Sequence, residues 1–343
     1  MIGYVFTGIA ASITTVIIGF RLYRTYFVWG DYHDMIKKYG KLKNFDQLTI
    51  VLTGCNTGIG KETARILYQN DARIIMANRN EAQTLEVIDE LRKQFPKSNG
   101  ELVYKRLDLS SMDSVKEFTK DIEKNESRVD VLINNAAVFG APRQITNDGF
   151  EINMQVNHLA QAVLVNRLLP KLSSVDSLGR IVQVSTTLTK TAKLDLEFLS
   201  KIDQNQLKNV SDKNIKVYQS SKLANLQFMR ALSVKLQSNS KNKIQICLAS
   251  PGFCYSRLHR YSSNKQMIFY SLLAPFLFAF MKSSRQGAQT IVGCSMIEHI
   301  RSTDVLYHNC AIDEEFLKKV PMSASITDET VYEITNKSIN EYC

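Results

Sequence analysis

The chain has 343 residues, of which 44% are hydrophobic and 22% charged, a composition that excludes a disordered protein and allows one large α/β core. Its net charge is +10, with the basic residues spread along the chain. Because no basic block with interleaved aromatic residues is present, the sequence argues against nucleic-acid binding. We interpret the excess of basic residues as surface charge, which favours contact with an anionic membrane face.

The cysteines lie far apart, without a CxxC pair or a Cys/His spacing typical of zinc. They are Cys55, Cys247, Cys254, Cys294, Cys310 and Cys343. We therefore expect a reducing compartment and no metal site, although an even number of cysteines alone would permit disulfides.

The amino terminus carries the clearest targeting signal. Residues 2–20 contain no charge, and about 20 apolar residues are enough to span a bilayer as a helix. Basic and aromatic residues follow, beginning with Arg21, Tyr23 and Arg24. We predict a membrane anchor over residues 1–20, a tether over 21–45 and a cytosolic catalytic domain; a cleaved signal peptide and a buried or interfacial helix are the alternatives.

From Asp46 onward, short β-branched runs alternate with longer amphipathic stretches, which is typical of βαβ units that form a parallel sheet. The predicted strands are Thr49–Thr53, Arg73–Ala77, Leu102–Leu107, Val129–Asn134, Arg180–Ser185, Lys243–Ala249 and Val305–Tyr307. Seven strands with flanking helices predict a single α/β domain over residues 46–343, built on a doubly wound parallel sheet.

The segment 267–281 is uncharged and has Pro275 at its middle. It is short for a membrane span. Two interpretations stay open: a buried helix pair kinked at the proline, and a hydrophobic lid over the substrate that touches the membrane surface.

A glycine-rich turn, Thr53 to Gly60, joins the first predicted strand to a helical stretch that begins at Lys61. Glycines at such a turn let the backbone approach a diphosphate and present it to the positive end of a helix. A tight turn also requires glycine, but the position at the first βα junction favours dinucleotide binding by a Rossmann-type sheet.

The spacing G-x-x-x-G-x-G after a threonine resembles the short-chain dehydrogenase/reductase family. The resemblance implies a set of cofactor-binding residues: Gly54, Asn56, Gly58, Ile59, Gly60, Asp108, Leu109, Asn135, Ala136, Pro251, Gly252 and Ser256. It implies in particular that Asp108 contacts adenine and that the loop from Pro251 closes over the nicotinamide. Ala137 stands where the family has glycine, and Ser256 where it has threonine.

The residue that follows the second strand indicates which dinucleotide binds. An acidic residue there would hold the ribose 2′-hydroxyl of NAD, but the sequence reads Ala77-Asn78-Arg79. Since Arg79 can pair with a 2′-phosphate, we expect NADP(H) as the cofactor. An exposed arginine without a ligand is the alternative.

Four residues stand in the order of the family's catalytic tetrad. Tyr218 and Lys222 are four apart on one helix face, so the ammonium is expected to lower the pKa of the phenol, which then exchanges a proton with the substrate oxygen. Both also belong to the expected cofactor site, since the resemblance places Lys222 on the nicotinamide ribose. Ser185, at a strand end, is expected to polarise the carbonyl. Asn157 matches the family asparagine that supports a water chain from Lys222. His158 and His259 are read as packing or surface residues.

The sequences of residues 53–64, 221–225 and 285–290 resemble those of the microsomal retinol dehydrogenases within that family. The resemblance covers residues 45–310 and implies a lipophilic substrate such as retinol or retinal at the endoplasmic reticulum membrane, with aldehyde reduction as the direction. A reductase of keto-steroids or other lipid carbonyls is the alternative enzyme, and a catalytically silent membrane scaffold the alternative of another class. Whether the chain forms a homo-oligomer stays open.

Overall fold

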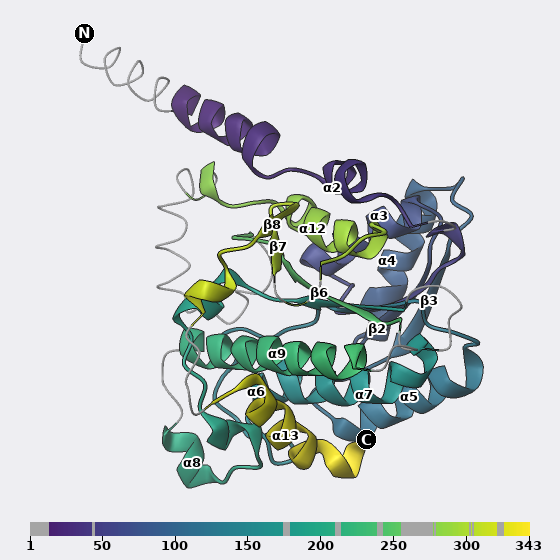
Figure 1. The fold of residues 1–343 in the computed structure, drawn as a ribbon. Helices are drawn as coiled ribbons and strands as arrows, with labels where there is room; N and C mark the ends of the chain where they lie inside the picture. The colour runs from purple at the N-terminus through teal and green to yellow at the C-terminus, as the bar shows by residue number, and fades with distance from the viewer. Residues whose placement is uncertain are drawn as a thin grey trace.

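The computed structural model describes residues 14–42, 45–173, 179–209, 214–238, 243–254, 277, 279–301, 303, 305–320 and 326–343. These residues form a sheet with helices packed on both faces (Figure 1). The expected Rossmann-type α/β fold is confirmed.

The sheet has eight strands in the order β3-β2-β1-β4-β5-β6-β7-β8. They are β1 (Thr49–Thr53), β2 (Arg73–Asn78), β3 (Glu101–Arg106), β4 (Val131–Asn134), β5 (Arg180–Val184), β6 (Gln245–Ser250), β7 (Leu306–His308) and β8 (Ala311–Asp313). The first seven are parallel, and their bounds differ from the predicted ones by at most two residues. Buried apolar runs such as that of β1 are what a sheet covered on both faces requires.

The eighth strand is a correction to the sequence prediction of seven. β8 pairs antiparallel with β7 through a two-residue turn at Asn309 and Cys310. Both turn residues have positive φ, 52° and 58°, as a tight hairpin turn with right-handed twist demands. Three residues are too few to display an alternating pattern, and a cysteine is not a turn signal, so nothing in the sequence pointed to this hairpin.

Two groups of helices bury the two faces of the sheet (Figure 1). On one face lie α2 (Tyr32–Tyr39), α3 (Gly58–Gln69), α4 (Glu81–Gln94) and α12 (Ser284–Met296). On the other lie α5 (Met112–Asn125), α7 (Ala160–Ser173), α9 (Asn214–Gln237) and α13 (Asp328–Ile339). The shorter helices are η2 (Phe45–Gln47), α6 (Ile152–Met154), η3 (Gln155–Leu159), η4 (Thr187–Thr191), η5 (Leu196–Leu199), α8 (Gln204–Asn209), η7 (Leu317–Lys319) and η8 (Asn340–Tyr342).

The chain changes direction across the sheet at the boundary between β1 and β4. From β1 it proceeds outward to β2 and β3, and from β4 outward to β5, β6 and β7. Loops that leave the carboxyl ends of β1 and β4 therefore diverge, and the crevice between them is where open α/β sheets bind ligands.

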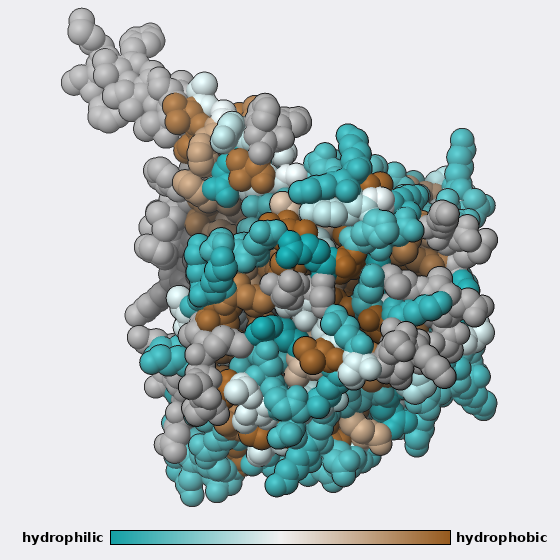
Figure 2. Space-filling model, viewed as in Figure 1, coloured by the Kyte–Doolittle hydropathy of each residue, from teal (hydrophilic) through white to brown (hydrophobic). Residues whose placement is uncertain are grey.

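The N-terminal segment is described from residue 14, as a helix over 14–23 that continues into the π-helix η1 (Arg24–Val28) and projects from the body (Figure 1). Its side chains Val16, Ile18 and Leu22 are exposed, and Figure 2 shows this helix as a hydrophobic projection. No helix within the described ranges is long and apolar enough to cross a membrane, and residues 1–13 of the predicted anchor lie outside those ranges.

The predicted tether contains a docked helix. Asp31 caps α2 with a capping box, and Met35 on this helix is fully buried. The Met35 side chain lies against Gly293 of α12, where an added Cβ would come within 2.2 Å of the methionine sulfur. The segment after the predicted anchor is thus tied to the domain by packing.

Most of the segment 267–281 lies outside the described residues. Of its described end, Ala279 is buried and Phe280 is exposed, with the Phe280 ring 5.3 Å from that of Phe20 in the N-terminal helix. The lid and the buried helix pair both stay predictions, as does the position of His259.

Candidate active site

The glycine turn between β1 and α3 is shaped by close backbone contacts. Gly54 and Gly58 have φ of +66° and +57°, which L side chains rarely adopt. A Cβ on Gly60 would lie 2.1 Å from the Gly54 carbonyl oxygen, and one on Gly54 would lie 2.8 Å from the Ala136 Cα. Only glycine fits at these two positions, so the turn presents bare backbone to the crevice.

Helix α3 begins at this turn without a side-chain cap. Its N-cap residue is Thr57, whose hydroxyl accepts no hydrogen bond from the first amides of the helix. Uncapped N–H groups at the positive end of a helix attract an anion. The turn therefore fits a dinucleotide diphosphate, with Asn56 and Ile59 flanking it in sequence; the Asn56 side chain donates to Gln83 Oε1 at 3.0 Å.

Asn78, the last residue of β2, holds the turn from the neighbouring strand. Its carboxamide oxygen accepts from the Cys55 amide at 2.9 Å, and its nitrogen contacts Cys55 Sγ at 3.1 Å. Burial raises the pKa of Cys55 to about 12, so this thiol stays protonated. Asn78 was not among the predicted site residues, although its place at the end of β2 marks it as a neighbour of the turn.

Arg79 lies just beyond Asn78 with 68% of its side chain exposed, and its guanidinium is 3.9 Å from the Asp108 carboxylate. Asp108 is held by Ser110, whose amide and hydroxyl both donate to the same carboxylate oxygen. Leu109 is buried. The structure therefore brings Arg79 and Asp108 together at the carboxyl edge of β2 and β3, where an adenosine would lie.

The loop that follows β4 is bonded directly to β1. The Thr53 hydroxyl accepts from the amides of Asn135 and Ala136, each at 3.0 Å. The Asn135 side chain donates to the carbonyls of Thr53 and Gly54, each at 2.9 Å. These bonds fix the spacing between the glycine turn and the loop that contains Ala137.

Tyr218 and Lys222 both lie on α9, and both are buried. Lys222 Nζ donates to the Val184 carbonyl at 2.9 Å and lies 6.0 Å from the centre of the Tyr218 ring. The helix thus places the pair next to the end of β5. The Phe139 ring packs edge-on against Tyr218 at 5.1 Å.

The expected direction of the tyrosine pKa was wrong for this geometry. Burial raises the pKa of Tyr218, and it lowers that of Lys222 to about 8. The ammonium is engaged by the Val184 carbonyl instead of the phenol, so its charge does not offset the loss of solvent around the tyrosine. Tyr218 is therefore held in the protonated form, as a proton donor must be.

Ser185 follows β5 directly, and its amide donates to the Ala249 carbonyl at 2.8 Å. Its hydroxyl is buried and has no hydrogen-bond partner in the part of the chain that the structure describes. A buried polar group without a partner is costly, so this hydroxyl is suited to bond a ligand atom. The ligand atom at this position would lie beside the carbonyl that engages Lys222.

Asn157 lies in η3, a π-helix of five residues. Its carboxamide accepts from the Val138 amide at 2.8 Å and donates to the Val138 carbonyl and to Ser221 Oγ, both at 3.0 Å. Short π-helical segments are frequent at functional sites. Asn157 thus joins the loop after β4 to α9, and its expected role in a water chain stays a prediction.

The loop after β6 begins with Pro251 and with Gly252 at φ +82°; Ser256 lies outside the described residues. Beside it lies Lys282, which the sequence analysis missed. Lys282 is 2% exposed, its Nζ has no hydrogen-bond partner among the residues described, and burial lowers its pKa. No local sequence signal marks a buried lysine.

His158 is buried and bonded at both ring nitrogens, which agrees with its reading as a packing residue. The described residues contain no group of three or more His, Cys, Asp or Glu side chains arranged to hold a metal ion. All six cysteines are free thiols.

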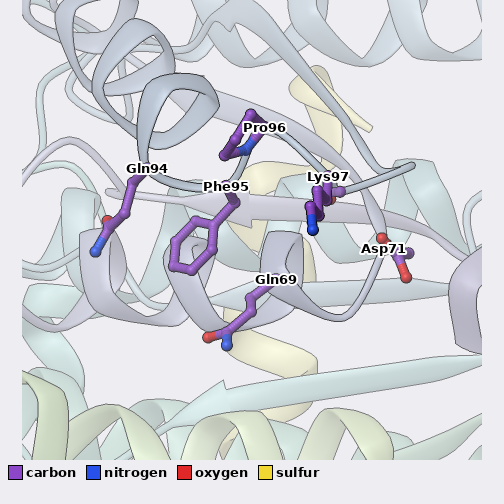
Figure 3. Close-up of a pocket in the computed structure, with 7 residues that line it drawn as sticks. Gln69, Asp71, Gln94, Phe95, Pro96 and Lys97 are labelled. Carbon is purple, nitrogen blue, oxygen red and sulfur yellow. The ribbon is translucent and has the colours of Figure 1, made fainter.

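A hollow of about 430 Å³ lies elsewhere, between the ends of α3 and α4 (Figure 3). It is lined by Gln69, Asp71, Gln94, Phe95, Pro96, Lys97 and Ser98. Asp71 and Ser98 precede β2 and β3, so the hollow is at the amino edge of the sheet, opposite the glycine turn and Tyr218. It takes no part in the site.

Comparisons with known proteins agree with this arrangement. Residues 48–194 match the family model described as short chain dehydrogenase. The chain is 35% identical to mouse retinol dehydrogenase 14 over 79% of this chain and 80% of that protein, and 34% identical to human retinol dehydrogenase 12 over 73% of each. Among solved structures, the Pseudomonas aeruginosa RhlG/NADP complex is similar in fold, with a TM-score of 0.55 and 20% identity over 74% of this chain and 93% of that one.

Proposed function

This chain belongs to the short-chain dehydrogenase/reductase family, and on that premise we propose that it is an NADP-dependent oxidoreductase that interconverts lipophilic alcohols and aldehydes. Retinol and retinal are the favoured substrate pair. The observation that carries the proposal is that a buried Lys222, near the buried Tyr218, donates to the Val184 carbonyl next to Ser185, whose buried hydroxyl has no partner among the described residues.

The glycine turn and the carboxyl edge supply the cofactor site. Close packing at Gly54 and Gly60 and the positive φ of Gly58 shape the turn at the uncapped start of α3, where a diphosphate would bind. Arg79 is the group that selects NADP, because Asn78 and Arg79 at the end of β2 offer no carboxylate to a ribose, whereas Arg79 offers an exposed guanidinium to a 2′-phosphate. When bound, the reduced dinucleotide supplies the hydride.

The residues of the chain handle the proton. The Ser185 hydroxyl donates a hydrogen bond to the aldehyde oxygen and draws electron density from the carbonyl carbon. The phenol of Tyr218, held protonated by its surroundings, gives its proton to the same oxygen as the alcohol forms. With the dinucleotide bound, the Lys222 ammonium, which donates to the Val184 carbonyl at 2.9 Å, would hold the nicotinamide ribose beside Tyr218. With NADPH as donor, aldehyde reduction is the expected direction.

The likeness to retinol dehydrogenases 14 and 12 and the apolar segment 267–281 support a lipophilic substrate. The tetrad does not select among carbonyl substrates, so a keto-steroid is included in the same assay. A silent scaffold is disfavoured because the full tetrad is present.

We also propose that residues 1–20 attach the enzyme to the endoplasmic reticulum membrane, with the domain in the cytosol. The run of uncharged residues before Arg21 supports this, and the exposed apolar side chains of the helix from residue 14 continue it. Deletion of residues 1–20 should move the protein from the membrane pellet to the supernatant. A glycan at Asn125, Asn209 or Asn336, each the start of an N-x-S sequon, would place the domain in the lumen and overturn the orientation.

The decisive experiment measures NADPH and NADH oxidation by the purified full-length protein with all-trans-retinal, a medium-chain aldehyde and a keto-steroid. Turnover of retinal with NADPH, lost in Tyr218→Phe, supports the proposal. Turnover of the steroid alone would reassign the substrate class, and no turnover of any carbonyl would favour the scaffold.

A further inference from the structure

A buried chain of hydrogen bonds connects the C-terminal helix α13 with the backbone of Asn157. Thr335 Oγ1 of α13 lies 2.9 Å from His158 Nε2, and His158 Nδ1 lies 3.0 Å from Asn225 Oδ1. Asn225 Nδ2 in turn donates to the Asn157 carbonyl. Thr335 and His158 are 0% exposed and Asn225 is 2% exposed, so solvent does not compete for these bonds.

The chemistry of the groups allows one direction of donation along this chain. Because the Asn225 amide nitrogen donates to Asn157, its oxygen is left to accept from His158 Nδ1. Burial lowers the pKa of His158 to about 4, so the ring is neutral at pH 7 and Nε2 is an acceptor. The Thr335 hydroxyl must therefore donate to Nε2.

The last acceptor in this series of hydrogen bonds is the carbonyl of Asn157, a residue that connects parts of the candidate site. The Asn157 side chain binds both backbone groups of Val138 and the hydroxyl of Ser221, next to Lys222. Asn157 lies in the π-helix η3, a kind of segment that is frequent at functional sites. A bond to its carbonyl from α9 fixes the place of this residue between the loop after β4 and the catalytic helix.

Helix α13 packs against α9 around these hydrogen-bonded residues. Tyr332 of α13 stacks on Phe228 of α9 at 5.1 Å, and Phe228 meets the His158 ring edge-on at 5.8 Å. The Arg230 guanidinium pairs with the Asp328 carboxylate at 2.9 Å. Helix α13 therefore packs on the helix that carries Tyr218 and Lys222.

We propose that Thr335 and His158 are positioning residues, through which the C-terminal helix holds Asn157, and with it Val138 and Ser221, in the geometry that catalysis requires. This inference rests on the proposed function for its kinetic readout. It assigns a role to the last 18 residues, 326–343, which the family resemblance left without one.

The test uses Thr335→Val in the full chain, a substitution that removes the hydroxyl and keeps the side-chain shape. We expect kcat for aldehyde reduction to fall about tenfold, with the KM for NADPH unchanged, because a small displacement of catalytic groups costs turnover and leaves cofactor binding intact. Thr335→Ser should restore at least half of kcat, since the donor returns.

Thr330→Val is the matched control, since it makes the same change on the same helix. The Thr330 hydroxyl lies 2.9 Å from Thr327 Oγ1, at the exposed start of α13. It should leave kcat within about twofold of the wild type. Equal losses in the two valine variants, or full activity in Thr335→Val, would overturn the inference. Thr335→Ala and His158→Gln are measured in parallel, so that one misfolded variant does not decide the outcome.

Hydrogen exchange supplies a readout that does not need turnover. Thr335→Val should speed exchange in peptides that cover Val138 and η3, and Thr330→Val should not. If the wild type reduces no carbonyl, the proposed function fails, and this comparison alone decides the coupling. Unchanged exchange at Val138 and η3 in Thr335→Val would refute it.

Discussion

Arg79 offers the sharpest test of the cofactor assignment. Its side chain is 68% exposed, and its ion pair with Asp108 spans 3.9 Å. An exposed pair at this distance contributes about 0–1 kcal/mol to folding, so Arg79→Ala should fold normally. A charge-assisted bond from a guanidinium to a 2′-phosphate contributes about 1.5–3 kcal/mol. Removing it should therefore raise the Kd for NADPH about 10- to 100-fold and leave the Kd for NADH unchanged.

The assay is titration of the purified protein with NADPH and with NADH, followed by nucleotide fluorescence. Arg301→Ala is the control, because Arg301 is also exposed and pairs with Glu314 but precedes β7, at the opposite edge of the sheet. Arg79→Asp should raise the Kd for NADPH above the Kd for NADH, since a carboxylate there repels the phosphate. If Arg79→Ala binds NADPH as tightly as the wild type, or if its affinity for both dinucleotides falls equally, Arg79 does not bind the 2′-phosphate.

Three other predictions test the rest of the site. Tyr218→Phe should lower kcat by about 10²- to 10⁴-fold while NADPH binding is retained, as measured by single-turnover kinetics and titration, and a retained kcat would remove Tyr218 from the reaction. Gly60→Ala should abolish dinucleotide binding in calorimetry, because its Cβ would meet the Gly54 carbonyl at 2.1 Å; normal binding would show that the turn can open. Since burial lowers the pKa of Lys222 from 10.5 to about 8, the ammonium is lost as pH rises through 8, so kcat for reduction should fall there. Over the same window the unfolded chain still binds the proton that the folded chain has released, so stability should rise between pH 8 and 10.5, and this rise should be absent from Lys222→Met in pH-dependent urea unfolding.

The sequence alone predicted the strands of the sheet and the candidate site residues. β-branched runs predicted the seven parallel strands, because strands covered on both faces must be apolar throughout. The glycine turn was readable because positive φ and close backbone approach leave no other residue type at Gly54 or Gly60. Tyr218, Lys222, Ser185 and Asn157 were predicted as site residues because they stand in the order of the tetrad of the family that the glycine turn resembles.

Tertiary structure decided what depends on distant neighbours. The partner of the Lys222 ammonium is the Val184 carbonyl, 38 residues away, and this contact together with burial sets the direction of the tyrosine pKa. The Asn78 bonds to Cys55, the buried Lys282 and the link from Thr335 to Asn157 join residues that no local pattern relates. Periodicity reports which face of an element is apolar, whereas desolvation and hydrogen bonding depend on what packs against that face, and only the folded chain settles it.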